Sequence, residues 1–68
     1  MEQGWVKIYT SDLDFKANMV STVLKDHDID VIIMNKKDSS YLAFGAIELY
    51  IHQANFDKAI EIIIKNEL

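Results

Sequence analysis

The chain has 68 residues, with seven lysines against eleven acidic residues for a net charge of −4, and it contains neither arginine nor cysteine. This length predicts a single domain, residues 1–68, and because no disulfide or thiolate metal site can reinforce so small a core, we expect a partner subunit to stabilise it. The small number of basic residues argues against nucleic acid as a partner. The sequence shows neither a basic leader nor an apolar run of about 18 residues, which argues against a membrane and predicts a cytoplasmic protein.

The first predicted elements are a strand over residues 5–10 and a helix that ends near residue 26 or 27. Ser11 and Asp14 have the spacing of a capping box, which predicts that the helix begins there. Phe15 and Met19 fall off the apolar stripe, so we expect them to cover a flank or touch something outside. The residues expected on the buried face of this helix are Leu13, Ala17, Val20 and Leu24.

The second half of the chain predicts two more strands, over residues 29–34 and 46–52, separated by a polar segment and followed by a second helix. Asn55 can cap that helix. The run of isoleucines at 62–64 makes a strand over residues 61–65 the alternative, but the helical period from residue 56 to 63 favours a helix. Its expected buried face holds Phe56, Ala59, Ile60 and Ile63, with Ile62 on a different side.

This order of elements predicts an α+β fold of the ferredoxin-like type, β-α-β-β-α, which lacks the usual last strand. Its three strands are expected to form an antiparallel sheet in the order 1-3-2, with both helices on one face. The side chains expected on that face are Val6, Ile8, Val31, Ile33, Leu49 and Ile51.

Short strings spread along the chain resemble a family of short bacterial domains, the putative prokaryotic signal-transducing proteins. They are Val6 to Thr10, Ala17 with the pair Val23-Leu24, Ile29 to Val31, Ile47 to Ile51 and the pair Ala59-Ile60. The family commonly has glycine before the second strand, where this chain has His27-Asp28. The resemblance implies a ferredoxin-like fold distantly similar to nitrogen-regulatory signal proteins, and it implies no established activity, cofactor or catalytic residue.

No group of residues predicts catalysis or a metal site. Residues 26–30 hold three aspartates and a histidine, but their spacing matches neither a zinc motif nor a calcium loop, so we interpret them as a solvated helix end. The serines and threonines have no motif that ties them to a histidine and an acid. We therefore expect no enzyme, no metal and no cofactor.

The side of the sheet away from both helices, the open face, carries the most informative pattern. It is expected to hold Trp5, Lys7, Tyr9, Ile32, Met34, Glu48, Tyr50 and His52, most of them large and apolar or aromatic. Such a patch is typical of an interface, although residues 41–44 could instead fold under and cover it. The predicted interface residues are Trp5, Tyr9, Ile32, Met34 and Tyr50.

Two further hypotheses concern a loop and a strand edge. Lys36 and Lys37, in the polar segment over residues 35–40, are predicted to recognise a partner. The first strand lies at an edge of the sheet with only Lys7 as a protecting charge, so it should be covered by the C-terminal tail or pair with the same strand of another copy. Pairing between copies is favoured, because the tail, residues 66–68, is short and polar.

Together these patterns predict a non-enzymatic protein-interaction or signalling module that self-associates through its sheet, as a homodimer or other homo-oligomer, and that can bind a protein partner. The alternative is a small-ligand sensor that uses the loop between the second and third strands. The sequence names neither partner nor ligand.

Overall fold

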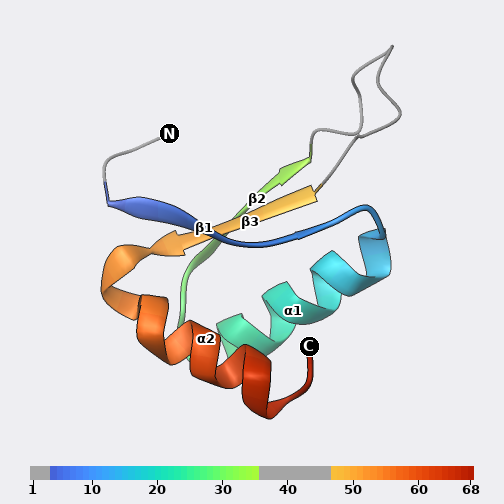
Figure 1. Cartoon of the computed structure of the whole chain (residues 1–68). Coiled ribbons are helices and arrows are strands. Elements are labelled where there is room, and N and C mark those ends of the chain that lie inside the picture. Colours follow the sequence, from blue (N-terminus) through green and yellow to red (C-terminus); the bar gives the residue numbers. More distant parts are fainter. Residues whose placement is uncertain (1–3, 36–46) are drawn as a thin grey trace.

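The structure, a computed structural model, describes residues 4–35 and 47–68 (Figure 1). The elements follow the predicted β-α-β-β-α order, with a short 3₁₀ turn before the last helix. They are β1 (Trp5–Ser11), α1 (Asp14–Asp26), β2 (Val31–Asn35), β3 (Ile47–His52), η1 (Gln53–Asn55) and α2 (Phe56–Lys65). The helical interpretation of residues 61–65 is therefore confirmed.

The three strands form one antiparallel sheet in the order β1-β3-β2, as predicted. Both helices lie against the same face of this sheet (Figure 1). The core between the layers consists of Ala17, Val20, Leu24, Ile29, Ile47, Leu49, Ile51, Ala59 and Ile62. Since β3 is the central strand, three of its residues, Ile47, Leu49 and Ile51, are buried at 4% exposure or less.

A β-bulge at Ile8 changes which side chains of β1 face the helices. Lys7 lies opposite Tyr50, but the next paired residue is Tyr9, which lies opposite Leu49. Cross-strand partners share one side of a sheet, and Leu49 is completely buried, so Tyr9 packs toward the core. The prediction that Tyr9 lies on the open face is wrong, because one extra residue reverses the alternation beyond it.

Helix α1 buries Ala17, Val20 and Leu24 as predicted, but it begins without the expected capping box. Ser11 lies three residues before Asp14, the first helical residue, and its hydroxyl accepts a hydrogen bond from the Leu13 N–H at 3.0 Å. The serine therefore makes a local turn and does not cap the helix. Leu13 is 44% exposed because it lies at the N-cap position, so the expectation that it belongs to the buried face is wrong.

Both helices end in Schellman turns in which an acidic residue takes the left-handed conformation usually given to glycine. In α1 this residue is Asp28, with φ 63°, and in α2 it is Glu67, with φ 54°. The Ile29 N–H donates to the Leu24 carbonyl at 3.1 Å, and the Leu68 N–H reaches back to Ile63 in the same way at 2.9 Å. The residue after each acid packs on the core, so these turns fasten the end of each helix.

The buried face of α2 differs from the predicted one. Ala59 and Ile62 are buried, whereas Phe56 is 39% exposed and Ile64 70% exposed. Ile62 thus lies on the core side of the helix, and the expectation that it sits elsewhere is wrong. Phe56, Ile60 and Ile64 are spaced four residues apart along one side of α2, about 90° or more from the core direction, and we call this row the α2 flank.

Candidate interaction surface

The middle of the open face is held together by a small polar network. The Tyr50 hydroxyl donates to Glu48 Oε1 at 2.9 Å, and Lys7 Nζ lies 3.5 Å from Glu48 Oε2. The Glu48 side chain is only 13% exposed, although its ion-pair partner Lys7 is 51% exposed. Because both charges are paired, this part of the surface presents a nearly neutral face on a chain whose net charge is −4.

One end of the open face is fastened by contacts around His52. The Trp5 and His52 rings meet edge to face, with centroids 5.9 Å apart and planes at 76°. His52 Nδ1 accepts a hydrogen bond from the Ala54 N–H at 3.1 Å and thereby caps η1. Gly4, at φ 92°, closes this corner, where its carbonyl accepts from the Gln53 N–H at 2.6 Å. His52 is therefore a structural residue at the junction between β3 and α2.

The structure supports the predicted position of some interface residues and not of others. Trp5, Ile32 and Tyr50 are half-buried, and Met34 is 36% exposed. The pairing of Ile32 with Tyr50 places both on the open face, as expected, whereas Tyr9 has moved to the core side. That the open face forms an interface stays a prediction. Lys36 and Lys37, like residues 41–44, lie outside the described residues.

The two edges of the described sheet differ in how they are protected against pairing with another chain. Strand β1 carries the bulge at Ile8 and the charge of Lys7, and a bulge is one of the devices that protect an edge strand. Strand β2 pairs with β3 over all five residues without a shift in register. Its sequence, VIIMN, has no charge and no proline, and Ile33 is 41% exposed.

The C-terminal residues do not extend the sheet beside β1. Within the part of the chain that the structure describes, the sheet has three strands and β1 pairs with β3 alone. Glu67 and Leu68 instead form the turn that ends α2. The suggestion that the tail covers the β1 edge as a strand is therefore wrong.

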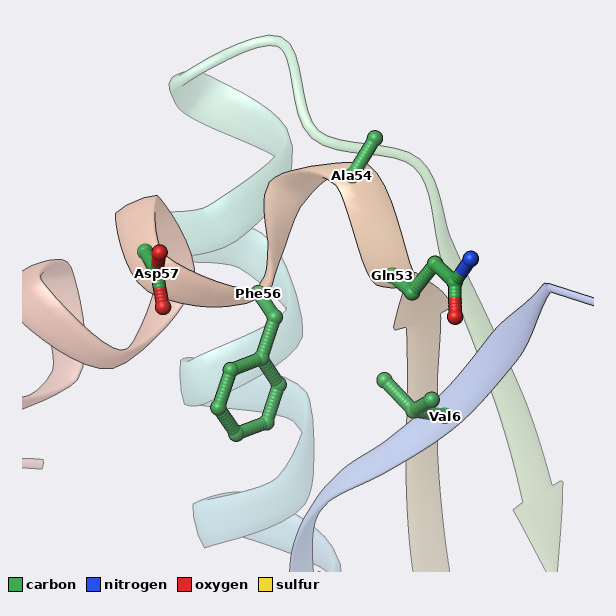
Figure 2. A pocket seen from close by; sticks show the side chains of 5 residues that line it. All are labelled: Val6, Gln53, Ala54, Phe56 and Asp57. Atoms are coloured by element: carbon green, nitrogen blue, oxygen red, sulfur yellow. The ribbon is translucent and has the colours of Figure 1, made fainter.

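A hollow of about 600 Å³ opens beside β1, where η1 leads into α2 (Figure 2). Val6 from β1 and Phe56 from the start of α2 give it an apolar lining, and Gln53 and Asp57 add polar groups. Ala54 completes the lining. The sequence analysis missed this site, because it rests on the exposure of Phe56, which the helical period had assigned to the core.

Other kinds of site find no support among residues 4–35 and 47–68. No cluster of three or more histidines and acids that could hold a metal ion occurs within these ranges. His27, the histidine in the acidic segment, uses Nδ1 to hydrogen-bond the Val23 carbonyl at 2.9 Å. None of the described helices has the length and apolar character needed to cross a membrane.

Comparison with known proteins and protein families places the chain in a family. A sequence model of a protein family described as putative prokaryotic signal transducing protein matches residues 5–67. No curated protein and no solved structure matches the chain. The matched region spans β1 to the end of the turn after α2, so the chain belongs to the family of putative prokaryotic signal transducing proteins.

Proposed function

We propose that this chain is a non-enzymatic signalling module that forms a homodimer by pairing β2 with the same strand of a second copy. The observation that carries this proposal is the β2 edge itself, which has regular geometry, no charge, no proline and no bulge. An exposed apolar edge strand is a template for pairing with another chain unless something blunts it. The family membership supports the signalling role.

The two edges explain why the proposal places the contact at β2 and not at β1. The sequence indicated that only Lys7 protects β1, but the bulge at Ile8 also interrupts its ladder. A copy of β1 could pair regularly only with the few residues on either side of the bulge. Strand β2 keeps an unbroken register with β3 over its five residues, so its outward N–H and C=O groups alternate regularly with those that bond β3.

A two-fold axis at Ile33, the midpoint of β2, would give the longest antiparallel ladder between two copies. Ile33 would then lie opposite the partner's Ile33, and Ile32 opposite the partner's Met34. The result is one six-stranded sheet with the helices of both copies on the same side. No charged residue of β2 enters this contact, so the net charge of −4 on each chain is not concentrated there.

So short a contact predicts a weak dimer. Interfaces below about 1,200 Å² are typical of transient signalling encounters, and we expect a Kd on the order of 10–100 μM. The association would contribute stability that rises with protein concentration, which suits a chain of 68 residues without a disulfide.

The test is sedimentation velocity from about 10 μM to about 1 mM for the wild type, Ile33→Lys and Ile64→Lys, a range that brackets the expected Kd. Ile33→Lys would set two ammonium groups opposite each other across the axis and should leave only monomer. Ile64→Lys makes the same chemical change at a position that is 70% exposed on α2, and it should dimerise like the wild type. Circular dichroism checks that both variants are folded.

A wild type that stays monomeric over the whole range would contradict the proposal, and so would equal weakening by both lysines. The alternative function, a small-ligand sensor built on the loop between β2 and β3, places its site outside the described residues and stays a prediction.

A further inference from the structure

The hollow beside β1 opens onto a longer apolar surface. Phe56 lines the hollow, and the α2 flank continues from it through Ile60 to Ile64. Phe56 and Ile64 are 39% and 70% exposed, and Ile60 is half-buried. On the other side of the hollow stands β1, whose outer edge bonds no strand in the described part of the chain.

The spacing of the α2 flank suits an extended chain. Residues four apart on a helix are separated by about 6 Å along its axis, and alternate side chains of a strand by about 6.6–6.8 Å. A strand lying between β1 and α2 could therefore place successive side chains of one face against Phe56, Ile60 and Ile64 in turn. Its backbone could pair with Trp5–Lys7, the part of β1 that precedes the bulge.

Asp57 gives this surface a preferred charge. Its exposed side chain lines the hollow next to Phe56 and makes no hydrogen bond or ion pair with the other described residues. Gln53, the other polar residue that lines the hollow, is uncharged. A carboxylate at the end of an apolar row selects a basic side chain at the matching end of whatever binds, because charge complementarity fixes register and favours one partner over another.

We propose that the hollow and the α2 flank bind an extended segment of a partner protein, with alternate large apolar residues and a lysine or arginine that meets Asp57. This site lies on the β1 side of the sheet and does not depend on dimer formation through β2. A partner segment could therefore bind the monomer and the dimer alike.

The probe is the peptide acetyl-Lys-Thr-Leu-Thr-Leu-Thr-Lys-amide, which reads the same in both directions and places both leucines and both lysines on one face. It is titrated to about 5 mM into ¹⁵N-labelled protein while the backbone amides are followed by NMR, a concentration that detects millimolar binding. We expect shifts at Val6, Gln53, Phe56 and Asp57. A second peptide carries norleucine in place of both lysines.

The variants separate a specific ion pair from general attraction. Asp57→Asn should weaken the lysine peptide about two- to fivefold, the range of an exposed ion pair, and leave the norleucine peptide unchanged. Glu61→Gln removes the same charge from the exposed face of α2 and should change neither affinity. Shifts confined to other residues, no shifts at all, or equal weakening by both variants would each overturn the proposal.

Discussion

The bulge at Ile8 determines which lysine substitution in β1 should destabilise the fold. A regular strand would give the opposite result. With the bulge, Tyr9 lies opposite the buried Leu49, and Thr10 lies opposite Glu48. In a regular ladder continued from Lys7, position 9 would lie opposite Glu48 and position 10 opposite the buried Ile47. The variants Tyr9→Lys and Thr10→Lys therefore report directly on the register.

The expected magnitudes follow from burial. Truncating a fully buried aromatic residue costs about 3–5 kcal/mol, so losing the half-buried Tyr9 ring should cost about 2 kcal/mol. Placing an ammonium group near Leu49 adds to this cost, although the lysine stem can carry the charge toward water, and we expect about 2–3 kcal/mol in all. Thr10→Lys should change the stability by less than about 0.5 kcal/mol, because Thr10 is exposed and lies opposite Glu48, whose charge Lys7 already pairs.

Urea unfolding, followed by circular dichroism and by the fluorescence of Trp5, measures both changes. A domain of this length is expected to unfold with roughly 3–10 kcal/mol, so Tyr9→Lys should lose a large share of its stability. A neutral Tyr9→Lys together with a strongly destabilised Thr10→Lys would show that β1 runs without the bulge. The assignment of Tyr9 to the core side would then be refuted.

Three further predictions concern a helix end, a cap and the open face. Asp28→Gly should raise the free energy of unfolding by about 0.5 kcal/mol, because relief of the left-handed strain exceeds the added entropy of the unfolded chain. A loss of stability in urea melts would contradict this prediction. His52→Ala should lower the free energy of unfolding by about 1 kcal/mol in the same assay, because it removes the acceptor for the Ala54 N–H. His52→Asn keeps an acceptor and should lower it less, and equal losses of stability would show that the cap contributes nothing. Replacing Trp5 and Tyr50 together with alanine should lower the free energy of unfolding by about 2–4 kcal/mol. If copies pair through β2, the dimer should still form in sedimentation experiments, whereas loss of the dimer in the folded variant would show that copies stack through the open face.

The sequence predicted the architecture well because most of its elements have strong periodicity. The alternation in β3 and the stripe of Ala17, Val20 and Leu24 both appear in the core as expected. The order of elements, β-α-β-β-α, predicted the strand order β1-β3-β2, and this strand order is confirmed. The end of α1 near residue 26 is confirmed as well, although the Schellman turn uses Asp28 where the family commonly has glycine.

The errors have local causes that the periodicity of side chains cannot show. A bulge adds one residue to a strand without changing its composition, so nothing around Ile8 announced that Tyr9 would turn to the core. In α2 the run of isoleucines fits two adjacent faces, and contact with the sheet selected the one that contains Ile62. The exposure of Phe56, and with it the hollow, follows from that choice.

The candidate site shows the same limit. The open face was predicted from alternation, and the sides taken by Ile32 and Tyr50 are as expected. The network between Lys7, Glu48 and Tyr50 depends on the register between strands, which a single sequence does not give. The contrast between the two edges likewise emerged only once β1 was seen to carry a bulge.

Amide hydrogen exchange across a range of protein concentrations tests the central claim, pairing of copies through β2, most directly. Alternate residues of Val31–Met34 direct their N–H groups away from β3, and among the described residues no strand lies beyond β2. Their protection should rise from about 10 μM to about 1 mM as the dimer forms, while the amides of Trp5–Ser11 keep the same protection throughout. Protection at β2 that does not change with concentration, or a rise confined to β1, would contradict the account.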